Sequence, residues 1–142
     1  MPTNPCVFCA LLAAPPEDSQ TDWVFRDAQV AAFLDKSPLF LGHVLVVPTT
    51  HVTTLADLPV ADLASYFGAV QRLTRAVQSG LGSDGIFVAN NNIVSQSVPH
   101  LHFHVIPRRK GDGLRGFFWP RQKYAGNSVD YAARIRAALE TP

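Results

Sequence analysis

The chain has 142 residues, of which 47% are hydrophobic and 16% charged, and its formal net charge at pH 7 is +1. We therefore expect one domain, residues 1–142, with a core that forms without disulfide bonds. So small a charge, without long runs of like charge, argues against a duplex nucleic acid partner. No apolar run approaches the ~20 residues of a membrane span, and the N-terminal residues lack a secretory signal, so we expect a soluble, cytoplasmic protein without a membrane partner.

Strand-like apolar runs follow a loop predicted at residues 15–22. Three of them come first, and they end at turn or proline residues: Trp23–Arg26, Val30–Leu34 and His43–Val47. Pro38 and Pro48 follow the second and third runs, and proline cannot donate to a strand ladder. The runs predict neighbouring antiparallel strands.

A helix is predicted over residues 58–79. Its apolar residues recur at steps of three and four: Leu63, Phe67, Val70, Leu73 and Val77. Gly80 and Gly82 are suited to end it. Two more strands, Ile86–Ala89 and His100–Ile106, and a C-terminal helix over Val129–Leu139 complete the pattern. Together they predict an α+β domain with an antiparallel sheet of about five strands, and a loop and helix over residues 109–142.

The five histidines lie in only two places. His43 and His51 flank the third strand, and His100, His102 and His104 alternate along the fifth. Alternate residues of a strand share one face, so the three form a row, while Leu101, Phe103 and Val105 face the core. An exposed sheet face that merely carries polar residues is the plain alternative. Three histidines at consecutive outward positions, from a total of five, disfavour it.

A single metal bound by the whole row is a second alternative. The first and third Cα atoms would be ~13 Å apart, which is too far for metal–ligand bonds near 2 Å. Imidazole also suits attack on phosphorus, because it is nucleophilic when neutral and ionises near physiological pH. Only His102 has a titratable neighbour on each side in the row, so we predict His102 as the nucleophile. His104 would then contact the phosphoryl oxygens or the leaving group, and His100 would lie at the outer end.

The run His100–Ile106 also resembles the signature of the histidine triad (HIT) superfamily, His-x-His-x-His-x-x with x apolar. Residues 32–35, residues 42–48 with His51, and residues 96–98 resemble the same family in the same order. The resemblance covers roughly residues 6–108 and places the core of the domain there. It implies the fold given above, a homodimer with paired sheets, and cleavage of nucleotides through a nucleotidyl-histidine intermediate on His102.

The resemblance also assigns roles outside the row. Asp35 matches the residue that binds the ribose hydroxyls, Ser97 the phosphate-binding loop, and His43 a pocket histidine behind the triad. Asn90 matches a phosphate-side residue, and Gln96 joins the nucleotide-binding set. The stretch from Asn90 to Gln96 is one residue shorter than usual, and Ser95 stands where the family has glycine. Asp35 as a mere turn residue and Ser97 as a solvated loop residue remain alternatives.

Cys6 and Cys9 have the spacing of half a tetrahedral zinc site. Reduced thiols without metal and a redox pair are the alternatives, but a redox pair usually follows a strand, and none is expected before Cys6. His51 and His100 remain as plausible donors once His102 and His104 act in catalysis. Several bacterial branches of the HIT family have a similar set. We therefore expect a structural zinc held by Cys6, Cys9, His51 and His100.

Two segments after the triad are less specific. Residues 107–113 resemble the fragile-histidine-triad branch, which cleaves dinucleoside polyphosphates. Residues 116–121 contain a Phe-Phe-Trp cluster that is either packing or a substrate contact.

The predicted reaction is hydrolysis or transfer at the α-phosphorus of a nucleoside phosphoramidate, dinucleoside polyphosphate or adenylylated compound, without a catalytic metal. A nucleotide-binding module without turnover and a metal-dependent hydrolase are the two other hypotheses. Against the latter, no acidic ligand is expected beside the triad.

Overall fold

The computed structural model describes residues 5–18, 20–115 and 121–139. It divides into two compact units, Met1–Asp112 and Gly113–Pro142. In the second unit, the helix α3 spans Ser128–Leu139, one residue longer than predicted. The Phe-Phe-Trp cluster lies outside the described residues. No described helix is both long enough and apolar enough to cross a membrane.

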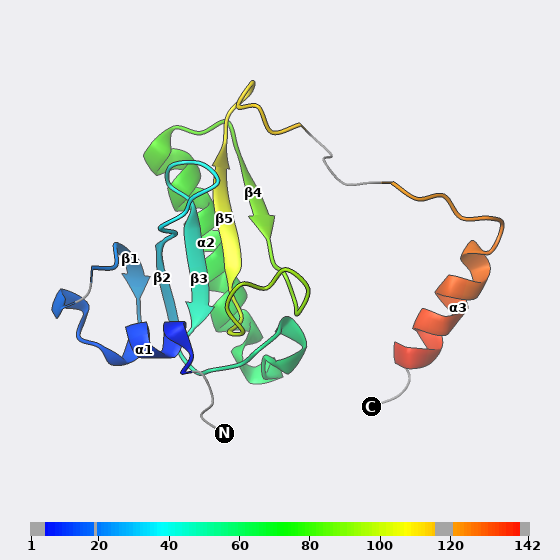
Figure 1. Ribbon diagram of the computed structural model, residues 1–142, viewed down its shortest axis with the longest axis horizontal. Helices are drawn as coiled ribbons and strands as arrows, with labels where there is room; N and C mark the ends of the chain where they lie inside the picture. The colour runs from blue at the N-terminus through cyan, green and yellow to red at the C-terminus, as the bar shows by residue number, and fades with distance from the viewer. Residues whose placement is uncertain (1–4, 19, 116–120, 140–142) are drawn as a thin grey trace. The chain divides into compact units, whose positions relative to one another are not determined.

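A five-stranded antiparallel sheet forms the frame of the first unit (Figure 1), and its strand order is β1-β2-β3-β5-β4. The strands are β1 (Trp23–Arg26), β2 (Val30–Leu34), β3 (Val44–Pro48), β4 (Gly85–Ala89) and β5 (Phe103–Arg108). This confirms the predicted α+β fold. The first two strands have the predicted bounds.

The predicted start of the fifth strand is wrong. His100 and His102 lie before β5, and only His104 belongs to it. Leu101 pairs instead with the loop after β3, where its N–H donates to the carbonyl of Val52 at 2.8 Å. His43 likewise comes just before β3, and Pro48 ends that strand opposite Val30. The alternation survives these shifts, because Leu101, Phe103 and Val105 all pack in the large core cluster.

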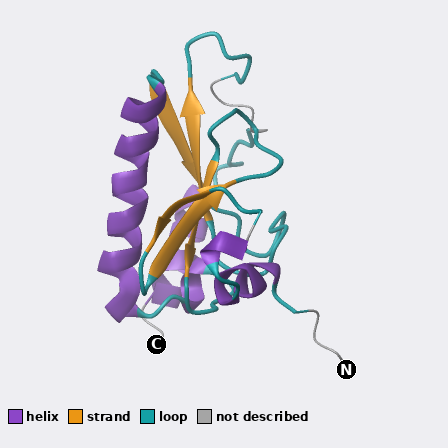
Figure 2. Cartoon of the chain, turned by 90° about the vertical axis from the view of Figure 1, so that its left-hand side faces the viewer, coloured by secondary structure: helices purple, strands orange, loops and turns teal. Residues whose placement is uncertain are grey.

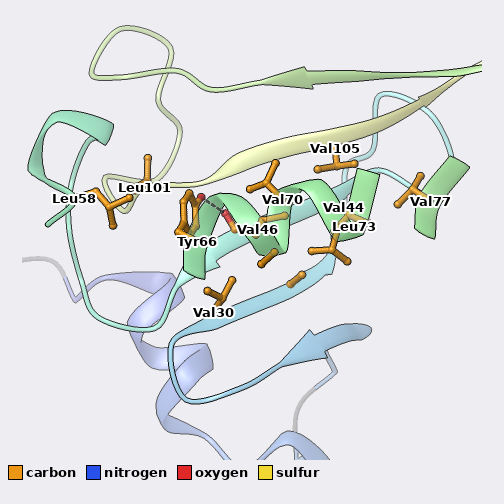
Figure 3. Packing of buried hydrophobic residues seen from close by; sticks show 12 residues of the cluster. Val30, Val44, Val46, Leu58, Tyr66, Val70, Leu73, Val77, Leu101 and Val105 are labelled. Carbon is orange, nitrogen blue, oxygen red and sulfur yellow. Dashed lines mark hydrogen bonds between the residues drawn. The ribbon is translucent and has the colours of Figure 1, made fainter. Parts of the chain in front are cut away.

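The helix α2 (Leu63–Leu81) runs along one face of the sheet (Figure 2). The predicted start at residue 58 is wrong, because Leu55–Asp57 and Val60–Asp62 form separate single turns before it. The predicted stop is close: Gly82 caps the helix with a left-handed φ of 61°. Tyr66, which the predicted stripe omitted, is 1% exposed and donates its hydroxyl to the carbonyl of Val46 at 2.7 Å (Figure 3).

The two faces of the sheet carry different clusters. Val30, Ala32, Val44, Val46 and Val105 point to α2 and form the main core. Their neighbours in sequence point the other way, and this second cluster holds Phe8, Ala31, Phe33, Leu45 and Val47. A helix that the sequence analysis missed, α1 (Val7–Ala13), supplies Phe8. The histidines lie on the α1 side of the sheet.

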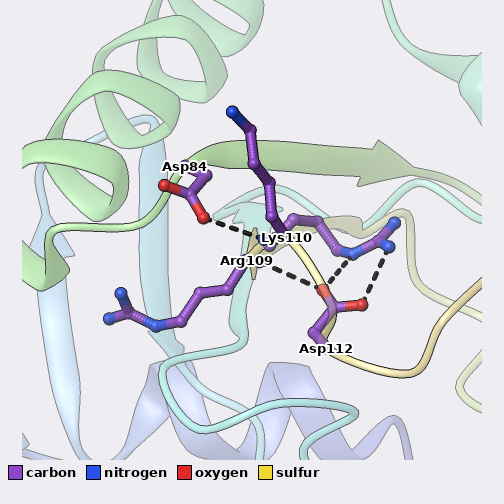
Figure 4. A network of polar contacts seen from close by, with 5 residues as sticks. Asp84, Arg109, Lys110 and Asp112 are labelled. Atoms are coloured by element: carbon purple, nitrogen blue, oxygen red, sulfur yellow. Dashed lines mark hydrogen bonds and ion pairs between the residues drawn. The ribbon is translucent and has the colours of Figure 1, made fainter.

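The charged residues at and after the end of β5 connect this strand to the end of α2 and to Asp84. Figure 4 shows their contacts with Asp84 and Asp112. The Arg108 guanidinium donates to both carboxylate oxygens of Asp112, at 2.6 and 3.0 Å. Arg109 donates to the carbonyls of Leu81 and Gly82, at 2.6 and 2.8 Å, at the C-terminal end of α2. Asp84 accepts the Lys110 N–H at 2.8 Å. These contacts hold the end of β5 beside the end of α2. The resemblance of this segment to the fragile-histidine-triad branch stays a prediction.

Candidate functional site

The tautomer of His102 is fixed by the main chain. Its Nδ1 lies 2.7 Å from the carbonyl oxygen of His100, which can only accept, so Nδ1 carries the hydrogen. In the neutral ring Nε2 then holds the lone pair, as a nucleophile requires. The group that fixes the tautomer is thus a backbone carbonyl and not a titratable neighbour in the row. Asn90 fixes the same backbone from the other side, because its amide donates to the His102 carbonyl at 2.9 Å.

His104 and His43 form a second chain with a defined direction. The Leu39 N–H donates to Nδ1 of His43 at 3.0 Å, which places the His43 hydrogen on Nε2. That Nε2 lies 2.8 Å from Nδ1 of His104 and donates to it. The remaining nitrogen of His104, Nε2, therefore carries a hydrogen in the neutral ring. The rings of His102 and His104 are 5.1 Å apart between centroids, so an acceptor nitrogen and a donor nitrogen belong to adjacent rings.

Asp35 lies beside this chain, contrary to the expectation that no carboxylate is near the triad. One oxygen is 3.7 Å from Nε2 of His43, and the other accepts the Ser37 N–H at 2.9 Å. Asp35, His43 and His104 have the donor types of a metal site and lie close together. His43 is unsuited to bind metal there, because its Nε2 carries the hydrogen while Nδ1 accepts from the backbone. Asp35 therefore lies close to the triad, but the hydrogen-bonding of His43 disfavours a catalytic metal at this place.

A cavity of about 270 Å³ lies in front of these groups. Its polar lining includes Asp35, Ser97, His102 and His104, so four of the predicted site residues converge. Its apolar lining comes from α1 and the sheet: Val7, Phe8, Leu11, Phe33 and Leu45. The α1 residues were missed. Phe8, Leu11 and Leu12 follow the three- and four-residue spacing of a helix, which was the available signal.

Asn90 and Gln96 do not line this cavity. Besides holding the His102 backbone, Asn90 accepts from the side-chain amide of Asn92 at 2.6 Å. Gln96 donates to the carbonyl of Thr53 at 2.6 Å and accepts the Ile93 N–H at 3.0 Å. Both side chains therefore brace the loop that leads to Ser97. Their assignment to nucleotide binding stays a prediction.

The same loop is strained. Ile93 and Ser95 have φ values of 72° and 61°, in the left-handed region that favours glycine. Ser95 is the position at which the HIT-like pattern has glycine. Strain of this kind is often stored next to functional sites.

Replacing Ser95 with glycine should stabilise the protein. Glycine adopts this φ without a steric penalty, so we expect Ser95→Gly to raise the free energy of unfolding by roughly 1 kcal/mol. Urea unfolding measures the difference. Asn91→Gly is the matched control, because Asn91 is exposed and is not among the described residues with positive φ. If both variants changed the free energy of unfolding by the same amount, the positive φ of Ser95 would not destabilise the protein.

Burial keeps the second histidine chain neutral. Desolvation, aided by the nearby His102 and His43, lowers the pKa of His104 from 6.5 to about 4. Desolvation also lowers the pKa of His43, although Asp35 opposes this shift. Both rings are therefore neutral at pH 7, which preserves the hydrogen-bond direction described above.

The protein should lose stability in mild acid through His104. Between pH 6.5 and about 4 the unfolded chain binds a proton at this residue that the folded protein does not, so stability falls as pH falls. From about pH 7 to about pH 5 we expect a loss of about 1 kcal/mol from this ring, allowing for its partial exposure. Urea unfolding of the wild type and of His104→Asn at both pH values measures the contribution of His104 to the free energy of unfolding. An identical pH dependence in the two proteins would refute it.

The cysteines and the two other histidines form a separate cluster. The Cys6 Sγ is 3.4 Å from Nδ1 of His100, and the Cys9 Sγ is 3.4 and 3.6 Å from Nδ1 of His51 and of His100. The two Nδ1 atoms are 3.2 Å apart. All four ligand atoms lie within 4.8 Å of one another. The expected ligand set is thus assembled in one place.

These distances fit a tetrahedral zinc ion. With bonds of about 2.3 Å to sulfur and about 2.0–2.1 Å to nitrogen, tetrahedral edges are about 3.6 Å from sulfur to nitrogen and about 3.4 Å between nitrogens. The His100 Nε2 donates to the Pro48 carbonyl at 2.8 Å, which leaves the lone pair on Nδ1, inside the cluster. His100 is 0% exposed, so this donor of the cluster is fully buried.

The cysteine pair opens a helix, which the sequence analysis did not expect. The Cys6 Sγ caps α1 by accepting the Cys9 N–H at 3.4 Å. Both thiols are free of disulfides. Burial and the neighbouring Cys6 raise the pKa of Cys9, which is the opposite of an activated redox thiol.

Comparison with known proteins identifies related sequences and structures. The HIT domain model matches residues 17–111. The Hit protein of Bacillus subtilis is 38% identical over 117 residues, which are 80% of this chain and 78% of that protein. A crystal structure of a HIT family member from the same organism superposes with a TM-score of 0.82 at 33% identity, covering 97% of this chain and 99% of that one.

Other similar proteins have named activities or a metal. An adenosine 5'-monophosphoramidase of Schizosaccharomyces pombe is 30% identical, over 81% of this chain and 83% of that protein. An adenylylsulfatase of Arabidopsis thaliana is 32% identical, over 78% and 56%. A bis(5'-nucleosyl)-tetraphosphatase of S. pombe is 33% identical, over 62% and 50%. A Zn-bound histidine triad protein from Mycobacterium smegmatis superposes with a TM-score of 0.70 at 35% identity, covering 94% and 97%.

Proposed function

The chain belongs to the HIT domain family, and we propose that it is a nucleotide hydrolase or nucleotidyl transferase acting at an α-phosphorus through a covalent adduct on His102. The observation that carries the proposal is the tautomer of His102, whose Nδ1 hydrogen is bound to the His100 carbonyl at 2.7 Å. A lone pair is thereby held on Nε2 of a ring that lines the cavity. Relatives that cleave phosphoramidates, adenylylsulfate and dinucleoside polyphosphates support the reaction type.

The neighbouring residues have complementary roles in this proposal. Nε2 of His102 attacks phosphorus, the P–N bond forms, and the bond to the leaving group breaks. Nε2–H of His104 donates to a phosphoryl oxygen, because its Nδ1 is already an acceptor for His43. Ser97 lines the cavity close to the same phosphate, and Asp35 binds the ribose hydroxyls. Water then attacks phosphorus, releases the nucleotide and restores His102.

We further propose that Cys6, Cys9, His51 and His100 bind one structural zinc ion. The four donors fit a closed tetrahedral site, and a Zn-bound family structure is similar to this chain. Zinc would supply a fixed connection between the N-terminal segment and the loop before β5. The proposed chemistry takes place on His102, whose ring nitrogens are outside this ligand set.

The nucleotide must be identified by assay. Adenosine phosphoramidate, diadenosine polyphosphates, adenylylsulfate and nucleotide sugars should be compared for turnover by the zinc-loaded protein. We expect release of a nucleoside monophosphate from at least one of them. Binding of nucleotides without turnover of any would instead favour a nucleotide-binding module.

A chelator separates the structural zinc from a catalytic metal. We expect activity to persist over short times in a strong chelator, because the attacking nitrogen needs no metal for activation. The assay is the turnover rate at saturating substrate, measured after chelator addition with folding monitored by circular dichroism. At saturating substrate a change in nucleotide affinity has no effect, so a loss of turnover with the fold intact, restored by zinc, would favour a metal-dependent hydrolase.

We also propose that the protein is a homodimer with paired sheets, as expected from the family resemblance. The strand β4 is at the edge of the sheet and pairs only with β5 among the described strands. Such an edge offers unpaired backbone groups to a second copy. Light scattering on the purified protein measures the mass, and that of a monomer would exclude the dimer under the conditions used.

A further inference from the structure

We infer that the metal site controls nucleotide affinity, because the helix α1, with Cys6 as its N-cap, carries both sulfur ligands and one wall of the nucleotide cavity. Zinc and nucleotide would then each strengthen the binding of the other. The inference rests on the proposed function, since it takes the cavity beside His102 as the nucleotide pocket. It goes beyond a structural zinc, which would stabilise the fold and leave the affinity of the folded protein unchanged.

The two sites share adjacent residues. Val7 and Phe8 stand between the sulfur ligands Cys6 and Cys9 in the sequence, and both line the cavity. Leu11, one turn further along α1, lines it too. A displacement of the sulfur atoms therefore moves the cavity wall with them.

The helix α1 has few means of holding its own position. It has seven residues, whereas isolated helices shorter than ~12–15 residues are marginal in water. Phe8 is buried in the smaller core cluster, with Leu11 and Leu12 packed against it. At the far end, the Arg26 guanidinium donates to the carbonyl of Leu12. At the near end, the described contacts of the two thiols with His51 and His100 are 3.4 to 3.6 Å long, so zinc bonds would be the strong attachment there.

Phe8 also links the metal site to the proposed nucleophile. Its ring meets the His102 ring edge to face, with centroids 5.3 Å apart and planes at 90°. It meets the zinc-site residue His100 in the same manner, at 5.8 Å and 72°. A shift of α1 would therefore change both the cavity wall and the packing of His102, and nucleotide affinity should fall.

Linkage makes this inference quantitative. If zinc raises nucleotide affinity by some factor, the nucleotide must raise zinc affinity by the same factor. We expect a factor of about ten, within the usual range for coupled sites. The probe is adenosine monophosphate, the product that the proposed reaction would release from an adenosine substrate.

The first experiment measures the dissociation constant of adenosine monophosphate by calorimetry, for zinc-loaded and zinc-depleted protein. Sucrose and low temperature keep the depleted form folded, as checked by circular dichroism. The second measures zinc transfer to a chromophoric chelator, with and without adenosine monophosphate. We expect the same factor of about ten from both. Equal nucleotide affinities of the two forms would overturn the coupling alone, whereas no binding by the zinc-loaded form would overturn the proposed function as well.

Two variants test the path through Phe8. Phe8→Ala keeps all four zinc ligands and should reduce the coupling factor from about ten towards one. Leu12→Ala is the control, because Leu12 packs in the same cluster but does not line the cavity, and it should keep the wild-type factor. If depleted Phe8→Ala unfolds even in sucrose, Phe8→Leu replaces it, because leucine fills more of the same space, and its coupling factor should also fall below that of the wild type. Equal factors for the two variants, by either method, would overturn the inference.

Discussion

His102→Asn should lower turnover by at least roughly 10³-fold while adenosine monophosphate still binds. Asparagine can donate its amide hydrogen to the His100 carbonyl, as Nδ1 of His102 does at 2.7 Å, but has no nucleophilic nitrogen. The substitution therefore removes the attacking atom and preserves the hydrogen bond. Steady-state kinetics and calorimetry measure the two effects separately. Rapidly quenched wild-type reactions should contain an acid-labile phosphoramidate on His102.

Two comparisons exclude a merely structural effect. His102→Ala should be equally inactive but less stable, because it also loses the hydrogen bond and the contact with Phe8. Asp35→Asn should weaken nucleotide binding and leave the intermediate detectable, since Asp35 is assigned to the ribose. Residual activity above about a tenth of wild type in His102→Asn would exclude His102 as the nucleophile, because loss of a nucleophile costs far more.

The sheet and its long helix could be predicted because their apolar periods are clear. Leu101, Phe103 and Val105 alternate, and all three pack in the main core. The start of β5 could not be predicted, because it depends on which partner the backbone finds. The Leu101 N–H binds the carbonyl of Val52 in a loop, and His100 turns away into the cluster with Cys6, Cys9 and His51. The alternation of apolar residues does not show at which residue the hydrogen bonds between two strands begin or end.

The candidate site could likewise be predicted only in part from the sequence. The histidines and cysteines could be found from residue type and spacing, and Asp35 from the family resemblance. Phe8 could not be assigned to the cavity wall, because this required the helix α1 and its position against β2. Nor could the His100 carbonyl be identified as the group that fixes the tautomer, because every residue has a carbonyl and only the fold determines which atoms it meets. Gly42 is a similar case: its φ of 98° strains any other residue just before His43, and an added Cβ would collide with the end of the Leu81 side chain.

Cys6→Ser with Cys9→Ser should abolish zinc binding and lower the melting temperature by about 10 °C. Free zinc at a thousandfold excess over Kd stabilises the folded state by about 4 kcal/mol, and each kcal/mol shifts the melting temperature of a domain this size by about 3 °C. Elemental analysis of wild-type protein purified without chelators should find about one zinc per chain, as four ligands in one closed site require. Calorimetry measures the melting temperatures.

The histidine ligands sharpen this test because their surroundings differ. His51 is exposed, so His51→Ala should cost zinc affinity and little else. His100 is fully buried and also donates to the Pro48 carbonyl, so His100→Ala leaves that acceptor without its partner and should cost more stability. Any residue at position 100 supplies the carbonyl that orients His102. A rate loss in His100→Ala therefore reports movement of the backbone. Well under half an equivalent of zinc in the wild type, or a Cys6–Cys9 disulfide, would contradict the zinc site.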